Sequence, residues 1–189
     1  MSIARTILRT TVGGLMLGHG LQKLQGAFDG PGLEGTEKMM GAIGIHPSKS
    51  AALAVAVSET VGGGLTAAGF MSPLGPAMIT GTMAVAVHKV HAKNGPWVTK
   101  GGFEYNLTLI AAALTLAAEG PGALSIDGLL RKQRSGFLWG LLAAALGLGA
   151  AAGVVALSDK MAPPSPQDST ERSIDLTDAA QATVETSHT

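Results

Sequence analysis

Three ionisable residues stand inside apolar stretches of this sequence, where charge is costly. His19 and Lys23 lie four residues apart near the end of one apolar run, and Glu59 lies well inside the next. On a helix the first two share a face. An ionisable side chain at mid-bilayer costs about 2.5–3.5 kcal/mol, so it normally faces a helix bundle and finds a partner. These residues therefore predict a buried polar cluster, which either exchanges protons or ties helices together.

The runs that must position this cluster are long and apolar. A helix needs about 20 residues to cross the hydrocarbon layer. The runs do not alternate, and their Ala, Leu and Gly content favours packed helices over strands. A soluble helical bundle is the alternative, but run 51–71 lacks the polar stripe that a soluble helix needs. We therefore predict membrane-spanning helices at roughly 5–24, 51–71, 74–92, 103–119 and 136–157.

Helices that alternate in direction bring the unusual polar residues to one side of the membrane. At 1.5 Å per residue, His19 lies about 7 Å and Glu59 about 12 Å inside their runs. The half-thickness of the hydrocarbon is about 15 Å, so Glu59 lies near the middle. His88 and His91 end the third run, and Glu104 opens the fourth. The pattern predicts a polar funnel that descends to Glu59, with His19 as one wall.

Two structural alternatives compete with a working site. Glu59 and His19 could simply hydrogen-bond and hold two helices together. Lys23 taken alone is typical of a residue that buries its stem and extends its ammonium group to the membrane interface. His19 and His88 could in principle ligate haem from two helices, but nothing else frames them. We therefore expect neither haem nor a metal.

The composition excludes several function classes. The chain is 46% hydrophobic and 14% charged, with no net charge and no cysteine. There is no basic block or phosphate-binding loop, so no nucleic-acid or nucleotide partner is predicted. Without cysteine the chain cannot form disulfides, thiolate metal sites or a thiol nucleophile. A redox role would require a diffusible or bound cofactor.

Short elements and a tail complete the expected organisation. A short interfacial helix is predicted at 36–44, with Thr36 as N-cap and Gly44 as terminator. Another is predicted within 120–134, with Ser125 as N-cap. Residues 163–189 are polar, acidic and rich in Ser and Thr, a composition typical of a disordered tail. GxxxG spacings, which can bring helices close together, occur at Gly14/Gly18, Gly136/Gly140 and Gly149/Gly153.

Four stretches of this sequence resemble the DoxX family of small bacterial membrane proteins. They are GGLMLGHGLQKLQGAFDGPG at 13–32, SETVGGGLTAAGFMSPLG at 58–75, HAKNGPWVTKGGFEYNLTLI at 91–110 and EGPGALSIDGLL at 119–130. The resemblance covers residues 1–130 and implies the family's usual bundle of four helices. The expected fold is thus an all-α membrane protein: a four-helix transmembrane bundle at 1–130, an appended fifth transmembrane helix at 131–158 and a disordered polar tail at 159–189.

The resemblance also implies a functional cluster. The family takes its name from a thiosulfate:quinone oxidoreductase context, and relatives are linked to sulfur, thiol and oxidant metabolism, although many have no established activity. Carried over onto this sequence, the cluster comprises His19, Lys23, Glu59, Trp97, Gly102, Glu104 and Tyr105. The expected catalytic residues are Glu59, Glu104 and His19, and the expected quinone-binding residues are His19, Lys23, His88, Trp97 and Tyr105.

Three function classes remain open at this stage. The first is a subunit of a quinone-linked oxidoreductase or of a membrane redox or thiol-stress complex, served by a soluble redox partner protein. The second is a non-enzymatic membrane anchor or assembly subunit, and the third a small transporter or proton path, although no internal repeat is visible. The expected location is the bacterial plasma membrane, crossed several times, and a homo-oligomer is left open.

Sidedness follows only weakly from the loop charges. The N-terminal side holds as many loop cations as the other side, so the positive-inside rule does not separate them. Short basic clusters near the run ends favour a cytoplasmic N-terminus. The two sets are Arg5, Arg9, Arg131, Lys132 and Arg134 against Lys38, Lys49, Lys89, Lys93 and Lys100.

Overall fold

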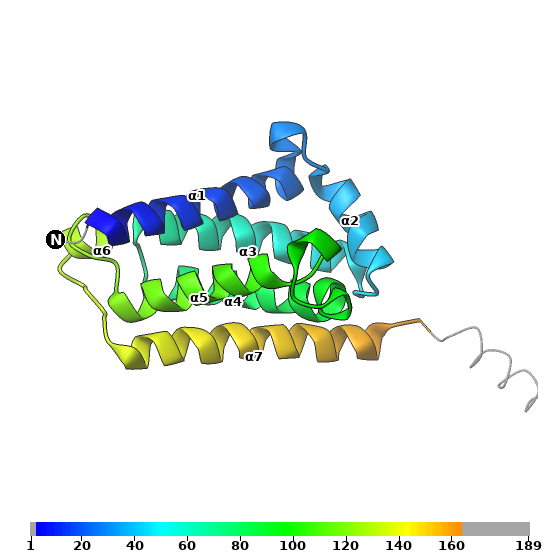
Figure 1. Cartoon of the computed structure of the whole chain (residues 1–189). Helices are drawn as coiled ribbons and strands as arrows, with labels where there is room; N and C mark the ends of the chain where they lie inside the picture. Colours follow the sequence, from blue (N-terminus) through cyan, green and yellow to red (C-terminus); the bar gives the residue numbers. More distant parts are fainter. Residues whose placement is uncertain (1–2, 164–189) are drawn as a thin grey trace, which may run out of the picture.

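The computed structural model describes residues 3–163, and that part of the chain is all-helical, without a strand. Five long helices run lengthwise through the molecule (Figure 1). Each corresponds to one predicted apolar run, so the helical class is confirmed. Of the tail that is expected to be disordered at 159–189, residues 164–189 lie outside the described residues, whereas 159–161 belong to the last long helix. The long helices are α1 (Ile3–Gln25), α3 (Ser48–Ala68), α4 (Leu74–Ala86), α5 (Glu104–Glu119) and α7 (Phe137–Met161).

Shorter elements connect the long helices. Between α1 and α3 lie a 3-10 turn and α2, and between α5 and α7 lies α6. After α4 the chain passes through one π-helical turn and two 3-10 turns before α5 begins. Their bounds are η1 (Ala27–Asp29), α2 (Gly32–Ala42), η2 (Val87–His91), η3 (Ala92–Asn94), η4 (Val98–Lys100) and α6 (Ile126–Leu129).

The helix ends test the capping predictions. Ser125 is confirmed as the N-cap of α6, because its hydroxyl accepts a hydrogen bond from the Gly128 amide at 3.0 Å. Gly44 is confirmed as the terminator of α2, with left-handed φ of 69°. Thr36 as the N-cap of α2 is wrong. The helix begins at Gly32 after Pro31, and the Thr36 hydroxyl lies buried inside it, donating to the Gly32 carbonyl at 2.7 Å.

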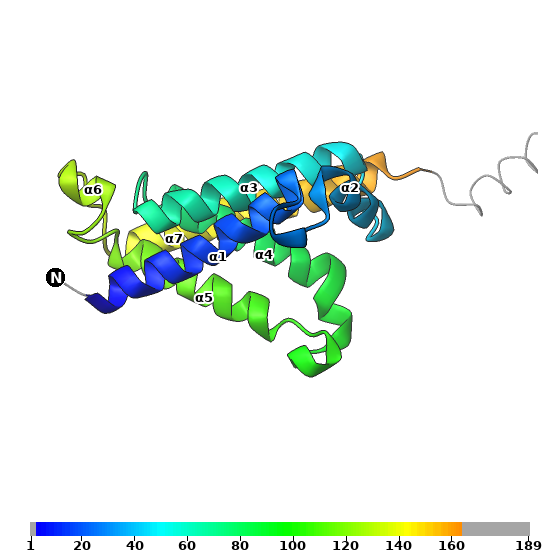
Figure 2. The same cartoon turned by 90° about the horizontal axis from the view of Figure 1, so that it is seen from above.

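The core lies where α1, α4 and α5 meet. Its buried side chains come from all three helices, so these helices pack around a common centre. α3 covers α1 and α4, while α7 packs along α4 and α5. Figure 2 shows the same arrangement from above. The central cluster comprises Val12 and Met16 of α1, Ile79 and Met83 of α4, and Leu109, Ala113 and Leu116 of α5.

Glycines let α1 and α3 approach closely. A Cβ atom on Gly63 would lie 2.7 Å from the Gly13 carbonyl oxygen, and one on Gly13 would meet the Gly63 carbonyl at the same distance. Both contacts are with backbone, which cannot move aside. The predicted GxxxG pairs contribute little by comparison: a Cβ on Gly14, Gly18, Gly136, Gly149 or Gly153 would meet nothing within 4 Å, and only Gly140 faces a neighbouring helix.

The fifth long helix, α7, is anchored along its length. A Cβ on Gly147 would lie 2.6 Å from the Ala77 carbonyl oxygen of α4. Near its end, the hydroxyl of buried Ser158 accepts from the His46 amide at 2.9 Å, and Asp159 pairs with Lys89 at 2.8 Å. The helix continues to Met161, three residues past the expected end of the fifth span at 158.

Within the described chain, α3 and α7 are the two helices long and apolar enough to cross a bilayer by length and hydropathy. α4 and α5 have 13 and 16 residues, and α1 carries Arg5, Arg9 and Lys23. These are physical reasons why the other three fall short of the same measure. A bundle of four spanning helices with one appended helix therefore stays a prediction.

Candidate functional site

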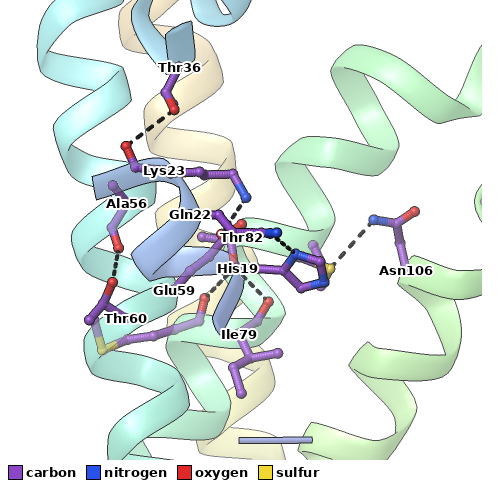
Figure 3. A network of polar contacts seen from close by, with 12 residues as sticks. His19, Gln22, Lys23, Thr36, Ala56, Glu59, Thr60, Ile79, Thr82 and Asn106 are labelled. Carbon is purple, nitrogen blue, oxygen red and sulfur yellow. Dashed lines mark hydrogen bonds and ion pairs between the residues drawn. The ribbon is translucent and has the colours of Figure 1, made fainter. Parts of the chain in front are cut away.

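The close contact between α1 and α3 sets Lys23 opposite Glu59. The helices run antiparallel, and the last turns of α1 meet the middle of α3. Lys23 Nζ lies 2.6 Å from Glu59 Oε2, and the two side chains are 18% and 5% exposed. Figure 3 shows this ion pair between the two helices. The predicted burial of Glu59 is confirmed, and Lys23 turns its ammonium group inward to the carboxylate.

His19 does not partner Glu59 in this arrangement. Its side chain is exposed, and its Nδ1 lies 3.1 Å from Gln22 Oε1 on the next turn of α1. The reason is its position around the helix, since the buried residues of α1 include Gly13, Met16 and Gly20 but not His19. In the view of Figure 3 the imidazole points away from α3, toward the side on which α5 carries Asn106.

Other polar side chains near the ion pair are engaged close to their own backbone. The Thr60 hydroxyl donates to the Ala56 carbonyl at 2.7 Å, and the Thr82 hydroxyl donates to the Ile79 carbonyl at 3.0 Å (Figure 3). Asn106 Nδ2 lies 3.5 Å from the Met83 sulfur. The Thr36 hydroxyl approaches the Lys23 carbonyl at 3.4 Å. The Lys23–Glu59 pair is thus the charged centre of a group of otherwise uncharged polar side chains.

A second group of candidate residues lies around the turn between α4 and α5. His91 ends the π-helical turn, and its Nδ1 lies 2.7 Å from the Gly101 carbonyl oxygen. The Glu104 amide donates to the Pro96 carbonyl at 2.8 Å. Gly102 is buried against the Gly95 and Pro96 backbone, so closely that a Cβ there would collide with both. These contacts fold residues 91–104 into a compact unit.

The candidate residues thus share one end of the molecule but form two groups. Lys23 and Glu59 lie between α1 and α3, while the 92–103 segment stands apart from α2 at the ends of α4 and α5 (Figures 1 and 2). His88, Trp97 and Tyr105 are exposed. Their predicted cofactor-binding roles, and the catalytic role of Glu104, stay predictions.

Residues at the opposite end of the bundle were missed as site candidates. Arg9 is buried, and its guanidinium donates to the carbonyls of Thr66 and Ala67 at the end of α3 and to Leu124 at 2.6 Å. It falls on the same buried stripe of α1 as Gly13 and Met16. The helical spacing of Arg9, Gly13 and Met16 was the signal available in the sequence. There, Arg9 entered only the comparison of cations on the two sides of the membrane.

Asp127 holds the same end together. Its carboxylate is 2% exposed and accepts the amide protons of Met71 and Ser72 at 3.1 and 2.9 Å. Backbone N–H groups are well suited to a buried carboxylate, since it is acceptor-only when ionised. The SxD motif around Asp127 therefore fixes the turn between α3 and α4.

No three histidine, aspartate or glutamate side chains within residues 3–163 gather closely enough to hold a metal ion. The expected absence of haem and metal stays a prediction.

The comparisons with known proteins give one match. A family model described as DoxX matches residues 4–92, which include His19, Lys23 and Glu59. No curated protein and no solved structure matches the chain. The motifs at 91–110 and 119–130 lie almost entirely beyond the matched range, so the carried-over roles of Trp97, Glu104 and Tyr105 depend on resemblance alone.

Proposed function

Residues 4–92 of this membrane protein belong to the DoxX family, and from that premise we propose a subunit of a quinone-linked oxidoreductase or membrane thiol-stress complex. In this proposal α1, α3, α4 and α5 form a four-helix membrane bundle, and α7 is a fifth span in the bacterial plasma membrane. The N-terminal end faces the cytoplasm. The observation that carries the proposal is the buried ion pair of Lys23 and Glu59, next to exposed His19 on α1.

The polar side chains of His19 and Gln22 on the last turns of α1 fit a quinone headgroup. In the tautomer whose Nδ1–H donates to Gln22 Oε1, the His19 ring presents the lone pair of Nε2 as a hydrogen-bond acceptor. The imidazolium form presents an N–H to a carbonyl oxygen instead. Because His19 is exposed on a helix in the bilayer, a lipid-soluble ligand reaches it laterally. A bound quinone would supply the electron-accepting chemistry.

The ion pair supports proton handling beside that position. A proton can pass from Lys23 Nζ to Glu59 Oε2 across the 2.6 Å hydrogen bond, which leaves an amine and a carboxylic acid. Net charge does not change in this transfer, so it avoids the large cost of creating a charge in low dielectric. The chain has no cysteine, so sulfur chemistry and electrons belong to a soluble redox partner protein.

A membrane anchor or assembly subunit is the second candidate. The observation that favours it is that the polar side chains around the pair already have hydrogen-bond or ion-pair partners within the protein. Glu59 is paired with Lys23, and the Thr60 and Thr82 hydroxyls bond to carbonyls of their own helices. Such contacts would also arise if the cluster only joined helices.

Quinone content after purification tests the proposal. Full-length protein is purified in mild detergent, and its quinone is extracted and quantified by mass spectrometry. We expect bound quinone in the unaltered protein and in His46→Ala, whose histidine lies in the α2–α3 loop. His19→Ala should lose it, because the position beside Gln22 then lacks its imidazole. Equal quinone content in His19→Ala, or none in any variant, would favour the anchor.

A further inference from the structure

α6 lies at the end of the molecule where α1 begins, opposite to α2 (Figure 1). The segment around it exposes a dense apolar surface. Leu129 is 81% exposed, and Leu124, Ile126 and Leu130 are exposed as well. Four large aliphatic side chains within seven residues are unfavourable in water. Their number and closeness mark this surface as one that contacts an apolar partner.

These side chains are held outward by bonds that fix the backbone beneath them. The Asp127 carboxylate accepts the Met71 and Ser72 amides, and the Asp127 amide donates to the Gly69 carbonyl at 3.0 Å. The Arg9 guanidinium donates a hydrogen bond to the Leu124 carbonyl at 2.6 Å. The buried Asp127 and Arg9 thus pin the segment against the α3–α4 turn, and the exposed leucines form a preorganised surface.

The apolar surface includes a shallow groove of about 320 Å³ between the end of α3 and α6. Its lining is almost entirely aliphatic, so it suits a hydrocarbon chain better than a polar ligand. The lining residues are Ala68, Ala123, Leu124, Ser125, Ile126 and Leu129.

Two cationic residues come shortly after Leu129, the last residue that lines the groove, in the sequence. Arg131 and Lys132 are exposed, and Arg131 has a left-handed φ of 54° in the turn that ends α6. The neighbouring Arg134 is engaged, since it donates to the Ser72 carbonyl and lies 5.5 Å from the centre of the Trp139 ring. Of the acidic residues at this end within residues 3–163, Asp127 is buried and bonded, and Glu119 is exposed.

From this juxtaposition we propose that the α6 segment binds an anionic phospholipid. An acyl chain lies in the groove along Leu124, Ile126 and Leu129, and the headgroup phosphate lies against Arg131 and Lys132. The charge of the segment selects an anionic headgroup over a zwitterionic one, because cations near a membrane surface attract anionic lipid. This site is separate from the proposed quinone position and does not depend on it.

Lipid retention measured by native mass spectrometry tests the site. Full-length protein in detergent is titrated with phosphatidylglycerol or with phosphatidylcholine of the same acyl chains. We expect tighter binding of phosphatidylglycerol. The double variant Arg131→Gln/Lys132→Gln should weaken it about twenty-fivefold, from about fivefold for each cation, with phosphatidylcholine binding unchanged. Lys93→Gln/Lys100→Gln, which removes two exposed cations at the other end, should retain the preference.

Leu129→Ser gives an independent readout, because a shortened groove should weaken both lipids alike. Thermal unfolding of each variant shows whether the fold is retained. Equal binding of the two lipids by the unaltered protein would overturn the proposal. So would a preference for phosphatidylglycerol that survives in Arg131→Gln/Lys132→Gln, or one that the Lys93/Lys100 control loses equally. A segment that binds neither lipid would point to a protein partner instead.

Discussion

At the scale of single residues, the Lys23–Glu59 pair should respond differently to single and double substitution. Lys23→Met leaves the Glu59 carboxylate charged and unpaired in apolar surroundings, so it should lower the free energy of unfolding by about 3 kcal/mol or more. Lys23→Met combined with Glu59→Leu removes both charges and should recover most of that loss. Thermal unfolding in detergent measures both effects. A double variant as unstable as the single one would contradict this account.

The same variants separate a working site from a joint between helices. In cells that lack the chain, the double variant should accumulate in the membrane and still fail to restore tolerance of oxidant or thiol stress. Glu59→Gln is a second variant to compare, because the amide keeps a hydrogen-bond acceptor of the same size for Lys23 while it removes the negative charge and the titration. If the double variant and Glu59→Gln both restored stress tolerance at normal abundance, the proton-handling role would be contradicted and the membrane-anchor function favoured.

The distance of Glu59 from the end of its apolar run predicted that this residue is buried. That distance could not predict that Lys23 is the residue that pairs with it. Distance from a helix end says nothing about the direction in which a side chain points. The buried stripe of α1 contains Arg9, Gly13, Met16 and Gly20, at helical spacing. Lys23 continues that stripe by three residues, whereas His19 falls beside it. A helical-face argument would have identified Lys23, and it would also have drawn attention to Arg9.

At the scale of elements, the contact between α1 and α3 depends on glycine at particular positions. Gly63→Ala should destabilise the protein, by about 1–3 kcal/mol, because the new methyl group meets the α1 backbone. Gly64→Ala is the matched control, since a Cβ there meets nothing within 4 Å. It should be neutral or slightly stabilising, as alanine favours helix more than glycine does. Unfolding midpoints of the two purified variants provide the comparison.

If Gly63→Ala were as stable as Gly64→Ala, the close approach of α1 and α3 would be contradicted. With the approach intact, Gly63→Ala should also loosen the Lys23–Glu59 pair about one helical turn away, because α1 and α3 would move apart. Bound quinone in that variant should then fall with stability, whereas in Gly64→Ala it should match the unaltered protein.

The long helices were predictable because each is a continuous apolar run bounded by glycine, proline or polar residues. The small-residue contacts between them were less predictable. GxxxG spacing pointed to Gly14 and Gly18, yet the tight contacts use Gly13 and Gly63. In a chain with 27 glycines, many such spacings arise without a contact. Which of them is used depends on which face of each helix the core residues turn inward.

At the scale of the whole molecule, the two ends are chemically different. One end holds the last turn of α1, with Lys23 paired to Glu59, and the segment that joins α4 to α5, with His91. The other end is fastened by Arg9 and Asp127, which satisfy backbone groups at the end of α3 and in the following turn. One end is therefore built for rigidity, and the other carries the charged pair in its interior.

The fifth long helix belongs to the same packed unit, although the family match ends at residue 92. Ala143 of α7 shares a buried cluster with Ala77 of α4 and Ala117 of α5. Ser158 and Asp159 tie its far end to the α2–α3 loop and to Lys89. Sequence reasoning treated this helix as an appendage, because no apolar pattern within one helix shows what it packs against.

Two truncations should therefore behave differently. Deleting residues 164–189 should leave membrane insertion and the thermal unfolding midpoint in detergent unchanged, because that polar sequence has no apolar period with which to pack. Deleting residues 136–189 should lower the midpoint and the membrane abundance, since Ala77, Thr80 and Gly81 of α4 lose the helix that covers them. A chain that ends at 135 with an unchanged midpoint would show that α7 is separable from the bundle. A large loss on removing only 164–189 would instead place part of the stability in the tail.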